Sequence, residues 1–113
     1  MRYDMGLDLT ISEQHNISED EKGRTTWQVT RLGNFRNCWD FLGRIQDRTD
    51  LYNCTTVNLD GDKIQEILDD MQEDVDENDS SKLRKELEYV KQVIKDGEIQ
   101  LDDEHTYEIH AWW

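Results

Sequence analysis

The segment Leu7-Asp8-Leu9-Thr10-Ile11-Ser12 alternates apolar and polar residues, which is the pattern of a β-strand with one buried face. Residues 25–30, which are rich in β-branched and aromatic side chains, predict a second strand that ends at Gly33-Asn34. The polar residues 13–23 between the two predict a loop or hairpin connection. Residues 106–111 alternate again before Trp112 and Trp113. We therefore predict two antiparallel N-terminal strands and a C-terminal strand that pairs with one of them.

The apolar spacing changes to three and four residues after the second strand, which indicates amphipathic helices. A first helix is expected to begin at Asn34, which is a suitable N-cap residue. Its predicted apolar stripe consists of Phe35, Trp39, Leu42 and Ile45. The opposite side carries Arg36, Arg44 and Arg48, which could contact nucleic acid, but the acids Asp40, Asp47 and Asp50 favour a solvated face instead.

Two further helices are expected in the second half of the chain. After a short extended piece at residues 54–57, Asp60 can cap a helix that gives way to a polar break at residues 74–81. The next helix is expected from about Ser81 to Asp96, with Gly97 as its stop. The fold class is therefore α+β, with three amphipathic helices packed on a small, mostly antiparallel sheet. The length of 113 residues corresponds to one domain, residues 1–113.

The negative charge is concentrated in the second half of the chain. Of the formal net charge of −14, residues 57–113 carry −12, and residues 60–79 alone hold ten acids and one lysine. In a helix with a rise of about 1.5 Å per residue this run has about one charge per 3 Å, close to the ~3.4 Å of a single DNA strand. The run could imitate nucleic acid or simply form a solvated face. We name as candidate partner-binding residues Asp69, Asp70, Glu73, Asp74, Asp76 and Glu77.

The sequence argues against a catalytic or metal-dependent function. Residues 74–79 imitate the start of an EF-hand loop, but Asp79 stands where that loop needs Gly and Lys85 where it needs Glu. The three histidines and two cysteines form no short-spaced metal motif, and no catalytic motif is recognisable. We therefore expect no enzyme activity, no metal and no cofactor. Cys38 and Cys54 are expected as reduced thiols in a cytoplasmic protein, since no apolar stretch suits a membrane span or signal peptide.

Several segments resemble, in this order, small uncharacterised proteins common in bacteriophage and prophage genomes. The resemblance rests on Met5-Gly6-Leu7-Asp8-Leu9, on Asn34-Phe35-Arg36-Asn37-Cys38-Trp39-Asp40-Phe41, on acidic helices at 60–74 and 81–96, and on the aromatic strand ending in Trp113. It implies that residues 1–4 are an N-terminal extension, because the group usually starts at Met-Gly-Leu-Asp. The group's mid-chain His is not evident here, so no role is carried over from it. The resemblance implies a phage origin, and the group has no established activity.

Three functional hypotheses follow from these features. The first is an inhibitor, such as an anti-CRISPR or other counter-defence protein, whose acidic run imitates DNA. Its partner would be a basic host protein, namely a nucleic-acid-binding defence nuclease. We expect neither direct nucleic-acid binding nor membrane binding. The second is an assembly module that forms a homodimer through Trp112 and Trp113, with the acidic run only solubilising. The third is a small enzyme or metal-dependent module whose site assembles from distant residues.

Overall fold

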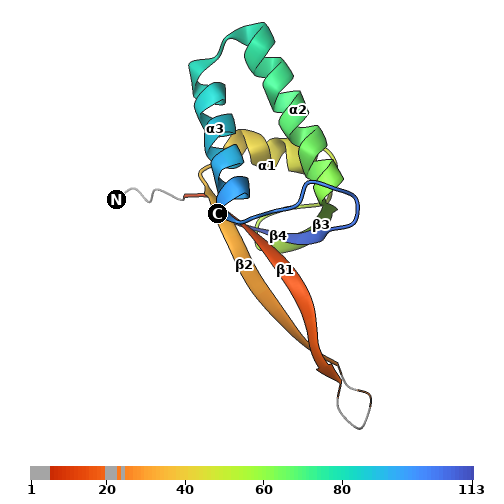
Figure 1. Ribbon diagram of the computed structural model, residues 1–113. Helices are drawn as coiled ribbons and strands as arrows, with labels where there is room; N and C mark the ends of the chain where they lie inside the picture. The colour runs from red at the N-terminus through yellow and green to blue at the C-terminus, as the bar shows by residue number, and fades with distance from the viewer. Residues whose placement is uncertain (1–5, 20–22, 24) are drawn as a thin grey trace, which may run out of the picture.

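The computed structural model describes the backbone of residues 6–19, 23 and 25–113, and the side chains of residues 6–13, 23 and 29–113. Its elements are β1 (Asp8–Glu19), β2 (Thr25–Arg36), α1 (Trp39–Gln46), β3 (Thr55–Asp60), α2 (Gly61–Asn78), α3 (Ser81–Asp96) and β4 (Thr106–Trp112) (Figure 1). The four strands form one antiparallel sheet in the order β2-β1-β4-β3. The predicted α+β class, with the C-terminal strand paired to an N-terminal one, is confirmed. The expected extension at residues 1–4 lies outside the described residues.

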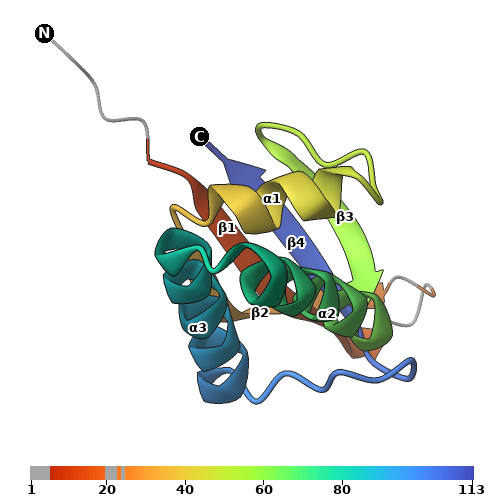
Figure 2. The ribbon, with the colours of Figure 1, turned by 90° about the horizontal axis from the view of Figure 1, so that it is seen from above.

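All three helices cover the same face of the sheet (Figure 2). The core lies between these two layers, because alternate strand residues point toward the helices. On β1 these residues include Leu9 and Ile11, and on β4 Tyr107, Ile109 and Ala111, all buried. The helices contribute their apolar stripes, among them Phe41, Ile64, Met71 and Val90. The other face of the sheet is open to solvent.

The hairpin of β1 and β2 extends beyond the rest of the molecule (Figure 1). β4 pairs with β1 only from Asp8 to Ser12, whereas β1 and β2 pair as far as Glu19 and Thr25. Residues 13–19 of β1 therefore have a strand neighbour on one side only. The principal extents of 58 × 42 × 25 Å reflect this projection. The structure thus consists of a compact body and a two-stranded ribbon, and the prediction that residues 13–23 form a mere connection is wrong for residues 13–19.

The expected start of the first helix at Asn34 is also wrong. Asn34 lies within β2, and Phe35 is buried as a strand residue. Gly33 does not end the strand, because it pairs with Ile11 and lets α3 approach closely: an added Cβ would lie 2.6 Å from Cγ1 of Val93. The turn comes at Asn37, whose φ is 57°, and α1 begins only at Trp39.

The second helix is longer than expected, because α2 continues through the predicted break at residues 74–81 as far as Asn78. Val75 is 3% exposed and extends the apolar stripe by one turn, so the polar residues around it lie on the outer face of a helix. The chain turns at Asp79, whose φ of 48° is left-handed. The predicted cap at Asp60 is confirmed, since its side chain accepts a hydrogen bond from Lys63 N at 2.8 Å. The predicted third helix and its stop at Gly97 are confirmed as well.

Both cysteines are free thiols. Cys38 is buried between the sheet and the helices, and burial, followed by the nearby charge of Glu86, raises the pKa of its thiol to about 12. This thiol is therefore protonated and unreactive at neutral pH. Cys54 is exposed. No helix in the described part of the chain has the length and apolar character needed to cross a membrane.

Candidate acidic interface on helix α2

A row of exposed carboxylates runs along the outer face of α2. Its members recur every three or four residues, which places them on one side of the helix. Val75 and the other apolar residues of α2 occupy the opposite side and are buried. At about 1.5 Å per residue the row extends over about 22 Å from Asp62 to Glu77, with about one carboxylate per 4 Å. We call this set the acidic row: Asp62, Glu66, Asp69, Glu73, Asp76 and Glu77, all of them exposed.

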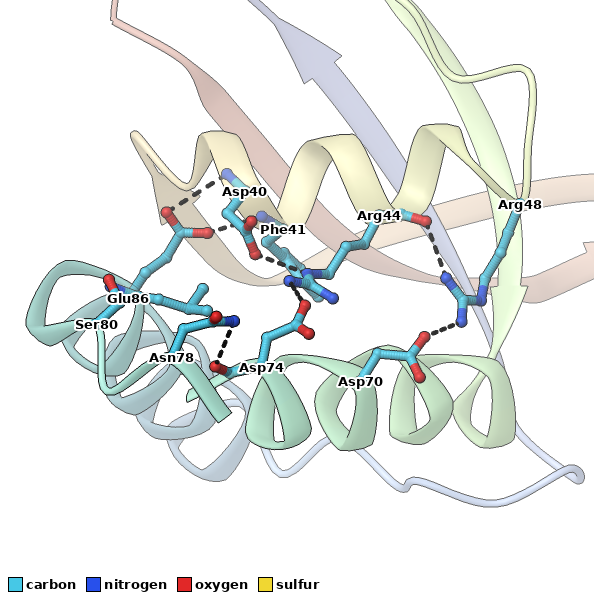
Figure 3. Close-up of polar contacts among 10 residues, drawn as sticks. Asp40, Phe41, Arg44, Arg48, Asp70, Asp74, Asn78, Ser80 and Glu86 are labelled. Atoms are coloured by element: carbon cyan, nitrogen blue, oxygen red, sulfur yellow. Dashed lines mark hydrogen bonds and ion pairs between the residues drawn. The ribbon is translucent and has the colours of Figure 1, made fainter. Parts of the chain in front are cut away.

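Four of the six residues predicted from the sequence belong to this row, and the other two do not. Asp70 and Asp74 lie on the flank of α2 that faces α1 (Figure 3). Asp70 pairs with Arg48, and Asp74 pairs with Arg44. Because each carboxylate has an arginine partner within the fold, these two residues join α1 to α2 rather than contribute free charge.

Arg44 is the best-enclosed cation of this contact. Its side chain is 17% exposed, and its Nε donates to Asp40 Oδ2 at 2.7 Å while its Nη2 donates to Asp74. Burial by itself would lower the pKa of Arg44, but the two carboxylates outweigh it and the pKa is raised. The guanidinium is therefore charged at every accessible pH. Arg44 and Arg48 thus point toward α2, and Arg36, which we expected on the same helix, lies on β2 and pairs with Asp8.

Few cations lie near the acidic row, and Arg84 and Lys91 of α3, which line a hollow with Asp76, are found only at its C-terminal end. Asp69 and Asp76 accept hydrogen bonds from the neutral amides of Gln65 and Gln72, at 2.9 and 3.0 Å. Glu66 lies 3.6 Å from Lys63 Nζ, the one ion pair that the row makes among the described residues. Six carboxylates and one lysine leave this face of the helix with a formal charge of −5. The face is therefore strongly negative and accessible to solvent.

The C-terminal end of α2 opposes the helix dipole. Cations are favoured at a helix C-terminus, yet the last turn contains no basic residue and carries Asp76 and Glu77 of the row. Asp79 follows immediately and is paired with Arg84 at 2.8 Å. Such an arrangement costs stability, which is expected where a surface is selected for something other than folding.

The N-terminal end of α2 is held firmly by the loop that precedes β4. Gly61 N donates to His105 O at 2.9 Å and Asp62 N donates to Asp102 O at 3.0 Å. The Asp102 side chain in turn accepts from His105 Nδ1 at 2.7 Å, an interaction that lowers the pKa of Asp102 and raises that of His105. Together with the Asp60 cap, these bonds satisfy the first N–H groups of α2 and fix the start of the row.

The structure offers the acidic segment no loop geometry for calcium. Asp74 to Asn78 are helical, and within the described ranges no group of three or more His, Cys, Asp or Glu side chains could hold a metal ion. His110 Nδ1 is bonded to Thr56 Oγ1 at 2.9 Å. The His15 side chain lies outside the described residues. The described residues thus offer no candidate metal cluster for the third hypothesis.

The two C-terminal tryptophans point in different directions. Trp113 packs against the rings of Trp39 and Tyr52, with centroid distances of 6.1 and 5.4 Å, and its backbone N donates to Asn53 Oδ1 at 2.8 Å. Trp112 is 57% exposed on the open face of the sheet. Of the predicted self-association pair, Trp113 is therefore engaged within the chain and Trp112 is accessible.

Comparison with protein-family models, curated proteins and solved structures finds no match to this chain. The candidate site therefore rests on the geometry of α2. Sequence reasoning identified the acidic run but missed Asp62 and Glu66 as members of the exposed row. The spacing 62, 66, 69, 73, 76 was the available signal, because it follows the helical repeat on the side opposite the apolar stripe.

Proposed function

We propose that this protein is a non-catalytic binding protein that occupies the basic, nucleic-acid-binding surface of another protein through the acidic row of α2. The observation that carries the proposal is the row itself, with six exposed carboxylates and one lysine on the face opposite the core. A surface of this charge accelerates association with a basic groove and makes binding depend on salt. Its spacing of about 4 Å per carboxylate is only slightly looser than the ~3.4 Å of a DNA strand, so the row approaches the charge density of a phosphate backbone without copying the phosphate positions.

The resemblance to phage proteins favours a particular class of partner. A phage-encoded protein that binds a basic groove in the host cytoplasm would act as a stoichiometric inhibitor of a defence nuclease, in the manner of an anti-CRISPR protein. Such nucleases need surfaces rich in Lys and Arg to hold nucleic acid, because the phosphate contacts dominate affinity. Occupation of such a surface excludes the nucleic acid without any chemistry on the part of the inhibitor.

The test is a pull-down from bacterial host lysate with two variants of equal charge. In the row variant Asp69 and Asp76 become Asn, and Glu73 and Glu77 become Gln. In the control variant Asp96 and Asp103 become Asn, and Glu98 and Glu104 become Gln, which removes four exposed acids outside α2. We expect the unaltered protein and the control variant to capture the same nucleic-acid-binding protein and the row variant to lose it.

Two further results complete this test. Captured partner should be released by added DNA or RNA and by salt, because both compete for the same basic groove. Equal capture by the row and control variants would refute a specific role for α2. Capture that nucleic acid does not displace would refute the occupied-groove mechanism even if the row proved necessary.

The exposed indole of Trp112 favours a second candidate, a homodimeric assembly module. Deletion of both tryptophans is a poor test, because Trp113 is part of the packing around Trp39 and Tyr52. Trp112→Ala removes the exposed ring alone. Light scattering after gel filtration should then show a dimer that becomes a monomer in the variant; a monomer in both proteins would exclude this candidate.

A further inference from the structure

The open face of the sheet carries an ordered set of polar and aromatic side chains. Across the strands, Arg36 of β2, Asp8 of β1 and Trp112 of β4 lie in one row. The next row consists of Asn34, Thr10, His110 and Thr56. Because neighbouring strands are about 4.8 Å apart, each row brings side chains from distant parts of the sequence within about 10 Å of one another.

These side chains surround a hollow of about 420 Å³, lined by Asp8, Thr10, Arg31, Asn34, Arg36, His110 and Trp112. Two arginines and one aspartate give its lining a formal charge of +1, in a chain whose total is −14. Arg36 Nη1 lies 3.1 Å from Asp8 Oδ1, which positions its guanidinium. Arg31 is exposed and makes no ion pair within the described part of the chain. The lining of the hollow is thus net positive, although the protein as a whole is strongly acidic.

The hollow combines two kinds of recognition group. The Trp112 indole, which is 57% exposed, offers a flat surface on which a planar ring can stack. Guanidinium groups present paired N–H donors that match the oxygens of a phosphate. A hydrogen bond of 2.9 Å between Thr56 Oγ1 and His110 Nδ1 fixes the imidazole in the neighbouring row. A ligand with both a planar ring and a phosphate would use all of these groups.

We propose that this hollow binds a mononucleotide, with its base stacked on Trp112 and its phosphate bound by Arg31 and Arg36. The volume is in the range of about 300–1,000 Å³ that is typical of small-molecule sites. A longer nucleic-acid strand fits less well, because each further phosphate would meet the field of an acidic protein. Its strand residues Asp8, Thr10, His110 and Trp112 alternate with buried residues of the core, so this site lies on the face of the sheet opposite the helices and shares no residue with the acidic row.

The test uses titration calorimetry with AMP, GMP, CMP and UMP, and with adenosine and inorganic phosphate as the two separate parts. We expect a mononucleotide to bind at least about tenfold more tightly than either part, since stacking and phosphate contacts add. Trp112→Ala and Arg36→Gln should each weaken that binding by about tenfold. Arg84→Gln changes an exposed arginine of α3, away from the hollow, and should leave the binding unchanged.

Four outcomes would overturn the proposal. The first is that none of the four mononucleotides shows saturable binding, and the second is that inorganic phosphate binds as tightly as a nucleotide. The third is that nucleotide binding is unchanged in Trp112→Ala. The fourth is that a single strand of ten nucleotides binds more tightly than the mononucleotide. Circular dichroism of each variant shows that the fold is intact. The row variant of α2 should bind the nucleotide as well as the unaltered protein, which separates this site from the proposed protein interface.

Discussion

Gly61 is the residue on which the position of α2 depends. An added Cβ would lie 2.0 Å from Gln100 O and 2.5 Å from Asp102 N, both backbone atoms of the loop that caps the helix. Gly61→Ala must therefore push this loop away and strain the bonds from Gly61 N and Asp62 N. We expect a loss of about 2–4 kcal/mol in the free energy of unfolding, measured by urea denaturation.

Gly43→Ala is the matched control for this substitution. Gly43 lies inside α1, and nothing would lie within 4 Å of an added Cβ there. Because alanine favours helix over glycine, this variant should be unchanged or more stable by up to about 1 kcal/mol. If both substitutions had the same effect, close approach at Gly61 would not be what places α2.

Glu86 supplies the N-terminal cap that α1 lacks in its own sequence. Cys38, at the cap position, makes no side-chain capping bond, and Glu86 of α3 accepts from Phe41 N at 2.7 Å and from Asp40 N at 3.4 Å (Figure 3). Burial raises the pKa of Glu86 above its ordinary value, although the two N–H bonds oppose this. The folded protein therefore binds a proton at Glu86 more tightly than the unfolded chain does.

This raised pKa predicts a pH-dependent difference between the protein and Glu86→Gln. Protonation of Glu86 favours the folded state, because the pKa of this carboxyl is higher there than in the unfolded chain. This contribution to stability is absent above the folded-state pKa. It grows as the pH falls from the folded-state pKa toward the ordinary pKa of a glutamate. Relative to Glu86→Gln, the unaltered protein should thus be more stable near pH 4 than near pH 7. Urea denaturation of both proteins across this range measures the difference; a difference that grows with rising pH would contradict the assignment.

At the scale of elements, two ion pairs of unequal strength join α2 to α1 and to the turn that follows α1. Arg44 is 17% exposed and bonds two carboxylates, whereas Arg48 is 29% exposed and bonds Asp70 alone. The loss of Arg44 leaves Asp40 and Asp74 without a countercharge at a partly buried contact. We expect Arg44→Ala to cost about 2–3 kcal/mol and Arg48→Ala less than about 1 kcal/mol, measured by thermal and urea unfolding. Equal costs would show that enclosure of Arg44 is unimportant.

The limits of sequence reasoning are clearest at the start of α1 and at the end of α2. Phe35 fits both the strand alternation from Gly33 and the helical spacing to Trp39, so only pairing with β1 decides that it belongs to β2. The polar break predicted at residues 74–81 takes no account of Val75, which follows Met71 by four residues and continues the apolar stripe of α2. Where a pattern is unambiguous, as in α3 and β4, the prediction agrees with the structure.

The candidate site shows the same limit. The acidic run is visible in the sequence, but its division into free and paired carboxylates depends on which flank of α2 meets α1. Arg44 and Arg48 are four residues apart, as are Asp70 and Asp74, and the pairs run in opposite directions along the two helices. Sequence spacing is compatible with this match without requiring it, because the packing of two helices is decided by the core between them.

At the scale of the whole molecule, charge is segregated between the two sides of a thin body. The helical side carries the acidic row, and the open face of the sheet carries the cationic hollow around Arg31 and Arg36. The smallest principal extent is 25 Å, so the two surfaces are separated by little more than one sheet and one layer of helices. A partner bound to the row and a ligand bound in the hollow would therefore occupy opposite sides without competing for space.

The projecting ribbon should be dispensable for folding of the body. Beyond Ser12, β1 is paired with β2 alone, and the described buried residues of these strands, such as Leu9, Ile11 and Phe35, all lie in the body. Replacement of residues 15–28 by Asn-Gly joins the paired residues Gln14 and Val29 through a two-residue turn suited to a hairpin. Because a two-stranded ribbon adds little stability, we expect a melting temperature within about 5 °C of the full chain.

A deeper replacement is the control for this shortening. If Asn-Gly replaces residues 11–33, it joins the paired residues Thr10 and Asn34 but removes Ile11, which is fully buried. This replacement also removes the β1 residues that pair with Ile109 and Glu108. We therefore expect it to abolish cooperative melting, as measured by circular dichroism. Because the first replacement keeps Arg31 and Trp112, the shortened protein should also retain the hollow. Unfolding of the protein that lacks only residues 15–28 would show instead that the ribbon belongs to the folding unit.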